Sequence, residues 1–450
     1  MDIVKPPIEN ILYPIMEKKK GNRIRYYIKE LKCSQTLSQK RLHDIQKEKL
    51  KKLLLECIEN VPAYQSFSYL KSDIETDAFS ALSKFPILDK KTFRKNPDIY
   101  LNRLASKSDL ISNCTGGSTS EPVKFFIDRR TVEYYEAARW RGLSWWGISP
   151  GTRSVMIWGD PYELNQNQKR EHRFKEKWFK NRIAIPAYSL NPESMKEYFK
   201  IIAGFRPKYF YGYSSALYAF ASLMFQQELT LPFKPSVVVS TAEVLHDYQR
   251  ELIEKAFGCS VVNEYGAKDA GILAYECKSG NMHISSENVM LEVLDAKTLQ
   301  PLSHGQSGIL LITDLNNFSM PRLRYRLGDS AILSKNICIC GKGLPVIEKI
   351  DGREDDMFVT VDGVLVHGHA FNHVSRSLNV IQKFQIIQNS PSQAELSIIP
   401  NDDSGKDDID KFIDGVQKLL PKTHIDIKIV KDIPVSSSGK FRYAIRKFSI

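Results

Sequence analysis

The 450-residue sequence predicts an α/β fold followed by a small α+β unit, and three patterns support this prediction. In the middle of the chain, short apolar runs alternate with amphipathic segments, which is typical of strands and helices built around a largely parallel sheet. From about residue 282, short apolar runs follow one another and are separated by turn residues, which indicates a β-rich part. From about residue 354, apolar runs and one helical pattern share about 95 residues, which indicates a separate small unit.

The first 105 residues are expected to be mainly helical. Residues 39–60 have leucine and isoleucine at three- and four-residue spacings, which predicts an amphipathic helix that Pro62 ends. Asp89 is well placed to cap a further helix that starts at Lys90.

In the middle of the chain, strands and helices are expected to alternate. Residues 161–182 are strongly polar, and we expect an exposed excursion there. The strands are expected at residues 123–127, 154–158, 207–211, 237–240 and 261–262, and the helices at 214–227 and 247–257.

The later part of the chain is expected to contain more strands than helices. In the β-rich part, strands are expected at residues 289–294, 308–313 and 331–333. In the last unit we expect a strand pair within residues 357–366, strands at 382–388, 394–399 and 426–430, and a helix at 410–420.

Composition and charge are those of a globular protein that is not embedded in a membrane. No apolar run approaches the roughly 20 residues needed to cross a bilayer, and the N-terminus lacks the pattern of a secretory signal, so we expect a cytoplasmic protein. The net charge of +12 allows anionic partners without selecting one, and no nucleic-acid-binding motif is present. The basic residues from Lys18 to Arg25 form either a solvated face or a contact for a membrane surface or another anionic partner.

A glycine- and hydroxyl-rich segment, Cys114 to Phe126, reads CTGGSTSEPVKFF. Gly116 and Gly117 let the backbone take positive φ, and turn N–H groups with neighbouring hydroxyls form a cradle for phosphate oxygens. The hydroxyls belong to Thr115, Ser118 and Thr119. The segment alone is also compatible with a surface loop, and it is not a Walker loop because no Lys-Ser/Thr follows at the required spacing.

Five more motifs follow in a fixed order. Two come directly after predicted strands, and the last is a flexible serine–glycine loop that precedes a lysine. They are STAE at 240–243, NEYGAKD at 263–269, YRLGD at 325–329, GREDD at 352–356 and SSSGKFR at 436–442.

The order and spacing of these six segments resemble the adenylate-forming ligase superfamily. Within it, the sequence is similar to the phenylacetate–CoA ligase branch and to the CapK-type proteins linked to capsular polysaccharide synthesis. The resemblance runs from about Lys84 to the C-terminus. It implies a large N-terminal α/β adenylation domain over residues 1–353, with a helical lead-in and a β-rich subdomain. A small mobile α+β C-terminal lid domain would occupy residues 354–450.

The resemblance also implies a two-step reaction. A carboxylic acid reacts with ATP to give an acyl-adenylate and pyrophosphate, and a thiol, commonly that of coenzyme A, or an amine then displaces AMP. Two alternatives stay within the fold: an amide ligase, or an adenylyltransferase that stops at the adenylate, both without coenzyme A. A non-catalytic basic surface-binding protein is an alternative of another class. The identity of the acid and the oligomeric state are not indicated.

Most nucleotide-contacting residues follow from the resemblance. Thr115 to Thr119 would cradle the β- and γ-phosphates. Glu264, Tyr265 and Gly266 would contact the nucleotide, with Tyr265 against the adenine. The backbone of Ala242 and Glu243 would lie along the ring edge.

The remaining roles concern metal, sugar and acid activation. Asp269 stands where most relatives have Glu and would help to hold Mg²⁺. Asp329 would accept hydrogen bonds from the ribose hydroxyls, and Arg353 would contact the ribose or phosphates. Asp355 would be the hinge, and Lys440 would bridge the carboxylate and the α-phosphate as the catalytic cation.

Two further sets complete the expected site residues. By analogy with relatives, Cys277, His283, Cys338 and Cys340 would hold a structural zinc ion; the alternative is reduced thiols beside a core histidine. The acyl group would lie near three residues that are equally compatible with plain core, namely Trp158, Tyr213 and Ser214.

Overall fold

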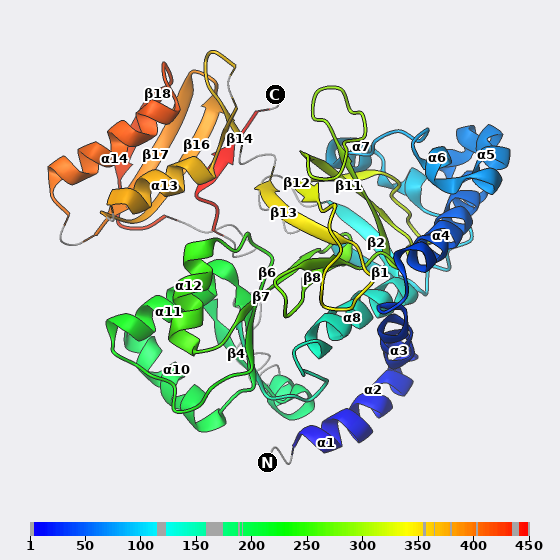
Figure 1. Ribbon diagram of the computed structural model, residues 1–450, viewed down its shortest axis with the longest axis horizontal. Coiled ribbons are helices and arrows are strands. Elements are labelled where there is room, and N and C mark those ends of the chain that lie inside the picture. The colour runs from blue at the N-terminus through cyan, green and yellow to red at the C-terminus, as the bar shows by residue number, and fades with distance from the viewer. Residues whose placement is uncertain are drawn as a thin grey trace. The chain divides into compact units, whose positions relative to one another are not determined.

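The computed structural model describes the chain except for residues 1–3, 115–122, 159–173, 188–189, 191, 354–356, 364, 379, 402–403, 434–440 and 449–450 (Figure 1). The chain forms two compact units. Of the described residues, the larger unit comprises 4–114, 123–327 and 331–350, and the smaller comprises 328–330 and those from 351 to 448.

The N-terminal part is helical, as the sequence predicts. Asp89 accepts a hydrogen bond from the backbone N–H of Thr92 at 2.6 Å, so the predicted cap is present. The elements are α1 (Lys5–Pro7), the π-helical turn η1 (Ile8–Leu12), α2 (Tyr13–Lys20), α3 (Ile24–Ser34), α4 (Gln39–Asn60), η2 (Pro62–Leu70), α5 (Lys71–Thr76), α6 (Ala78–Leu82), α7 (Lys90–Lys95) and η3 (Pro97–Tyr100).

In the described residues, eleven strands of the larger unit form one sheet in the order β10-β11-β12-β13-β9-β8-β7-β6-β5-β3-β4. The strands at the β4 end, from β4 to β7, run parallel, whereas β7, β8 and β9 are antiparallel. The bounds are β3 (Ser154–Trp158), β4 (Arg182–Pro186), β5 (Tyr209–Tyr213), β6 (Val237–Thr241), β7 (Val261–Ala267), β8 (Gly271–Glu276), β9 (Met282–Ile284), β10 (Val289–Leu294), β11 (Ser307–Asp314), β12 (Tyr325–Leu333) and β13 (Val346–Arg353). A separate hairpin joins β1 (Leu110–Cys114) and β2 (Lys124–Asp128).

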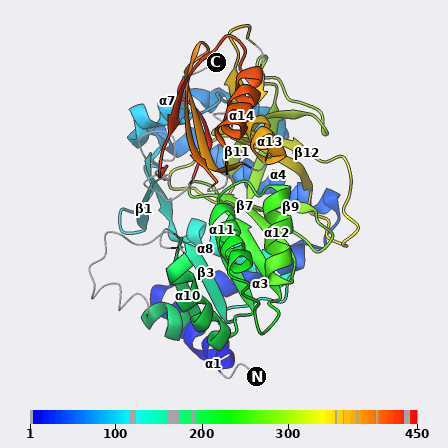
Figure 2. The same cartoon turned by 90° about the vertical axis from the view of Figure 1, so that its left-hand side faces the viewer.

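Helices cover both faces of the parallel part (Figures 1 and 2). One face packs against α10 (Pro192–Phe205), α11 (Ser214–Gln226) and α12 (Asp247–Phe257) through a core that includes Phe210, Phe220 and Phe257. The other face packs against α3 and α8 (Arg129–Ser144), with Val239 and Val262 in its core. This arrangement confirms the predicted α/β class.

Several local expectations need correction. Residues 182–186 form the edge strand β4, which pairs with β3 and was not expected; only its first residue falls within the predicted excursion at 161–182. The strand β7 extends through polar motif residues that the sequence placed after the strand, and β12 begins at Tyr325, ahead of the strand predicted at 331–333. The strands β8, β9 and β13 were not expected, and β10 to β13 continue the main sheet instead of forming one of their own.

The smaller unit has an α+β structure, as predicted. A sheet in the order β18-β17-β16-β19 packs against α13 and α14 through Phe384, Phe412 and Val416. The helix α13 was not expected, because its sequence is largely polar. The bounds are β14 (Met357–Val359), β15 (Leu365–His367), α13 (His369–Leu378), β16 (Ile381–Ser390), β17 (Gln393–Pro400), α14 (Lys406–Leu419), β18 (His424–Ile429) and β19 (Ala444–Arg446). No described helix is long and apolar enough to span a bilayer.

A buried ion pair joins three segments of the larger unit. Arg141 of α8 donates to Glu287 at 2.7 Å and to the Ser285 hydroxyl at 3.0 Å, and both charged side chains are at most 3% exposed. The Ser34 hydroxyl of α3 donates to the same carboxylate. The pair therefore fixes α3 and α8 to the turn between β9 and β10.

Replacing Arg141 by methionine should lower the free energy of unfolding by about 3–5 kcal/mol, because Glu287 would remain buried without its cation. The matched control is Lys71→Met, which breaks the exposed pair with Glu59 and should cost no more than about 1 kcal/mol. Chemical denaturation of both variants measures the difference, and equal losses would show that the buried pair is not a special constraint.

Candidate functional site

Four parallel strands of the larger unit bring predicted site residues to one edge of the sheet. Trp158, Tyr213 and Thr241 are the last residues of β3, β5 and β6, and Glu264 of β7 pairs in register with Thr241. In open α/β sheets, ligands bind outside the carboxyl ends of the strands. The structure therefore brings the predicted STAE and NEYGAKD motifs together at a typical ligand-binding edge.

The segment after β6 has a strained backbone held by side-chain hydrogen bonds. Ala242 has a φ of +67°, an unusual conformation for a residue with a Cβ. The hydroxyls of Ser214 and Ser240 lie 2.6 Å apart, and the backbone N–H of Ser215 donates to Glu243 at 2.8 Å. The start of α11 thus holds the turn in place, and strained backbone of this kind is often found at functional sites.

An aromatic group lies at the same edge beside a buried carboxylate. The ring of Trp158 lies 4.1 Å from that of Tyr213 and 5.9 Å from that of Tyr211, measured between centroids. The Tyr211 hydroxyl donates to Glu264 at 2.6 Å, and Arg139 of α8 lies 3.7 Å from the other carboxylate oxygen. Burial, and then the charge of Glu264, raises the pKa of Tyr211, so the phenol remains a donor. The arrangement offers flat apolar faces next to a fixed polar group.

Tyr265 and Gly266 follow Glu264 in β7. Tyr265 is half-buried against the main core. A Cβ at Gly266 would lie 2.6 Å from the carbonyl oxygen of Gly271, so β8 approaches too closely to allow a side chain. The backbone beside Tyr265 is therefore fixed by the β7–β8 turn.

The turn between β7 and β8 lies against the β1–β2 hairpin. Asn113, near the end of β1, donates to the carbonyl of Lys268 at 3.4 Å. Arg322 donates to the carbonyl of Asp269, and its guanidinium carbon lies 4.3 Å from the centroid of the Phe125 ring in β2. The two strands that flank the glycine–hydroxyl segment are thus held beside an acidic turn about 150 residues later in the chain.

Asp269 has the burial and the free oxygen that a metal ligand needs. It is 5% exposed, and its Oδ2 atom makes no hydrogen bond to a described residue. The charge of Asp269 contributes, after burial, to a raised pKa of the Tyr325 hydroxyl, so the two side chains lie close together. A buried carboxylate oxygen without a donor fits a hard cation such as Mg²⁺.

The other predicted nucleotide contacts are less fully described. Asp329 is half-buried in β12, and Arg353 is the last residue of β13. Thr115, Gly116, Gly117, Ser118, Thr119, Asp355 and Lys440 lie outside the described residues.

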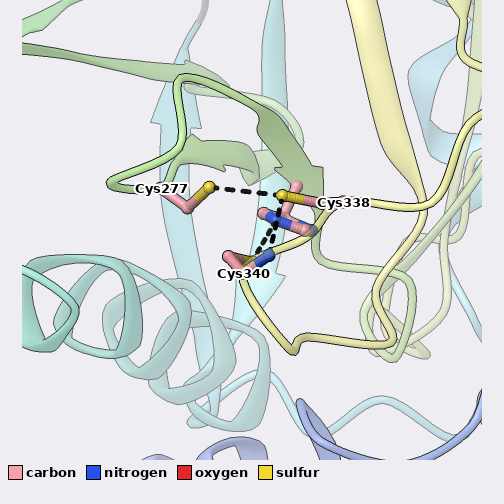
Figure 3. Close-up of side chains that lie close together, drawn as sticks. Cys277, Cys338 and Cys340 are labelled. Atoms are coloured by element: carbon pink, nitrogen blue, oxygen red, sulfur yellow. Dashed lines mark hydrogen bonds between the residues drawn. The ribbon is translucent and has the colours of Figure 1, made fainter.

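Three cysteines and a histidine form the second candidate site (Figure 3). Their potential ligand atoms all lie within 4.8 Å of one another. The sulfur atoms of Cys277 and Cys338 are 3.7 Å apart, which is too far for a disulfide bond and close to the roughly 3.8 Å expected for two thiolates around tetrahedral zinc. The four residues predicted from the sequence are therefore brought together.

The histidine of this cluster is oriented as a metal ligand. Its Nδ1 atom lies 3.0 Å from the carbonyl oxygen of Leu344, which can only accept, so Nδ1 carries the proton. The lone pair of Nε2 is then directed towards Cys340, whose sulfur lies 3.1 Å away. Burial lowers the pKa of His283 to about 4, which keeps the imidazole neutral near pH 7. A carbonyl that fixes the tautomer is typical of zinc-binding histidines.

Comparisons with known proteins agree with this architecture. Residues 358–447 match the family model of the CapK C-terminal domain. Protein CapK of Staphylococcus aureus is 26% identical over 81% of this chain and 80% of its own length. Phenylacetate-coenzyme A ligase of Thermus thermophilus is 24% identical over 81% of this chain and 82% of its own length.

Among solved structures, 2-hydroxyisobutyryl-CoA ligase in the postadenylation state, in complex with R3-HIB-AMP, superimposes with a TM-score of 0.70 at 18% identity. The match covers 92% of this chain and 91% of that one. The chain thus has the fold of the adenylate-forming ligases. In sequence the chain is similar to CapK and to phenylacetate-coenzyme A ligases, which confirms the resemblance inferred from the motifs.

Two residues of the candidate site were not found by sequence reasoning. Arg139 faces Glu264 from α8, and Arg322 anchors the Asp269 turn. Both belong to segments without a recognised motif. A signal existed for Arg139, because it lies four residues after Tyr135 and therefore on the same side of an aromatic-rich helix.

Proposed function

We propose that the chain uses ATP to convert a carboxylic acid to an acyl-adenylate and then transfers the acyl group to the thiol of coenzyme A. In the first step a carboxylate oxygen attacks the α-phosphorus and pyrophosphate leaves. In the second step the thiolate attacks the acyl carbon and AMP leaves. The observation that carries the proposal is the contact between the Asp269 turn and the hairpin that flanks the glycine–hydroxyl segment, next to the strand ends that carry the STAE and NEYGAKD motifs.

The proposed nucleotide contacts follow from this placement. Tyr265 would lie against the adenine, and the strained backbone at Ala242 would meet the edge of the ring. Asp329 would bind the ribose hydroxyls, and Arg353 would contact the ribose or a phosphate. Asp269 would hold Mg²⁺, which neutralises phosphate charge when it is bound.

The acyl group is proposed to lie near Trp158 and Tyr213, with Ser214 at the start of the following helix. The two adjacent rings, which are tilted relative to each other, would cover a flat or apolar acyl group. Glu264 is held by the Tyr211 and Thr241 hydroxyls, so it would stay fixed while the acid binds.

Lys440 and Thr115 to Thr119 remain predictions from the motifs. The lysine would neutralise the carboxylate and the α-phosphate in the first step, and the threonine–glycine segment would bind the β- and γ-phosphates.

Lys440→Ala should abolish ATP–pyrophosphate exchange, because no other cation would bridge the two reacting anions. Its melting temperature should equal that of the unmodified protein. The control is Lys431→Ala, an exposed lysine outside the motif, which should keep full exchange. Wild-type exchange in Lys440→Ala would remove this residue from the mechanism.

The acceptor can be identified by supplying preformed acyl-adenylate with coenzyme A or with amines, once exchange has identified an acid. We expect a thioester, since both a relative and the superimposed structure are CoA ligases. An amide formed without coenzyme A would make the chain an acid–amine ligase, and release of the adenylate alone would make it an adenylyltransferase. The chemical identity of the acylated product would also test whether the enzyme acts in surface polysaccharide biosynthesis.

The cysteine–histidine cluster is proposed to bind structural zinc. Three thiolates and one imidazole close a tetrahedral set, so no position remains for substrate. The ion would tie the end of β8 and the strand β9 to the loop that contains Cys338 and Cys340.

Protein purified without chelator should contain about one equivalent of zinc by elemental analysis. Cys338→Ser should lose the metal and melt at a lower temperature, because metal binding contributes directly to folding free energy. Cys33→Ser is the matched control, since this cysteine is exposed and outside the cluster. Zinc far below one equivalent in the unmodified chain would contradict the proposal.

A further inference from the structure

The N-terminal helical segment, α1 to α2, is fixed to the larger unit by one face. Ile8 is 2% exposed, and the Tyr13 ring makes an edge contact with Trp140 at 6.4 Å between centroids. Glu17 is 7% exposed and accepts a hydrogen bond from the backbone N–H of Arg25 at 2.7 Å. The segment is therefore an ordered part of the fold with a defined outer face.

The outer face combines apolar and basic side chains. Ile11 and Ile15 are each 57% exposed, and their four-residue spacing puts them on one side of the helix. Lys18 and Lys19 follow on the same side one turn later, and Lys20 ends the helix, all three exposed. Because η1 is a π-helical turn, the side chains of Ile8 and Ile11 point in more different directions around the helix axis than they would in an α-helix. Ile8 is buried and Ile11 is exposed. We call Ile11, Ile15 and Lys18 to Lys20 the outer face.

The outer face keeps its positive charge. Residues 5–34 contain eight lysines and arginines against three glutamates. One of these carboxylates, Glu17, is paired with Arg25, and Glu9 lies 3.9 Å from Lys5. Within the described part of the chain, no carboxylate forms an ion pair with Lys18, Lys19 or Lys20.

Charge complementarity selects among the surfaces that could cover this face. In a symmetric contact with a second copy of the chain, the two lysine clusters would come close together and repel each other. A nucleic acid would neutralise the lysines and leave Ile11 and Ile15 in water. An anionic lipid surface satisfies both, because apolar side chains enter the boundary between headgroups and acyl chains while lysines bind the headgroups.

We infer that the outer face is a docking surface for an anionic lipid bilayer. Ile11 and Ile15 enter the headgroup–acyl boundary, and Lys18 to Lys20 lie against the lipid phosphates. Binding is peripheral and reversible, since two isoleucines bury little apolar area and the lysines act through a screened electrostatic attraction. The inference does not depend on the proposed ligase function.

The test is co-sedimentation of the full chain with sucrose-loaded vesicles. Binding is expected to phosphatidylcholine vesicles that contain phosphatidylglycerol, with much weaker binding to phosphatidylcholine alone and loss of binding at high salt. The triple variant Lys18→Gln, Lys19→Gln, Lys20→Gln should lower the partition coefficient by about 100-fold, roughly fivefold per lysine. The charge-matched control changes Lys196, Lys200 and Lys208, which are exposed elsewhere on the same unit, to Gln.

The apolar part is tested separately. The double variant Ile11→Ser, Ile15→Ser should weaken binding to anionic vesicles, whereas Ile201→Ser, which removes an isoleucine 42% exposed on α10, should not. Equal melting temperatures would show that the variants are folded. Three results would overturn the inference: no sedimentation of the unmodified chain with anionic vesicles, equal losses in the lysine variant and its control, or a dimer that Ile11→Ser, Ile15→Ser dissociates without altering vesicle binding.

Discussion

The parallel pairing of β3, β5, β6 and β7 is the constraint on which the candidate site depends. Because parallel strands end at the same edge, each strand delivers its following residues to the same place. The register makes Thr241 a neighbour of Glu264, so the STAE and NEYGAKD motifs cannot separate without breaking the sheet. The helices on both faces keep these strands buried, which fixes the register further.

The antiparallel strands that continue the sheet, β8 and β9, carry or adjoin residues of both candidate sites. The tight β7–β8 turn presents Asp269 and is anchored through Arg322 to the hairpin strand that carries Phe125. Farther along, β8 and β9 present Cys277 and His283 to the cysteine cluster. The strand β8 therefore links the two candidate sites. The turn with Asp269 precedes it, and Cys277, a candidate zinc ligand, follows it directly.

The sequence predicted best where local physics alone decides the structure. The helices at 39–60 and 247–257 have their predicted bounds, because their apolar spacing and flanking residues are unambiguous. Polar residues concealed strand structure: Asn263 and Glu264 lie inside β7, where the sheet supplies partners that periodicity does not reveal. The edge strand β4 was missed for a related reason, since its charged surroundings dominated a short apolar alternation.

The candidate site, like the fold, combines residues that local sequence patterns reveal with residues that only long-range contacts reveal. The order of motifs predicted the resemblance to CapK and the phenylacetate–CoA ligases, because glycine, hydroxyl and acidic residues at turns have few alternative uses in such a combination. The candidate contacts taken from the same motifs stay predictions. Arg139 and Arg322 carry no such signal, since an arginine in a helix or a loop is normally solvated. Their positions follow from carboxylate and carbonyl partners more than 50 residues away, at Glu264 and Asp269. Residues that position a site through another side chain therefore become visible only when the fold brings both partners together.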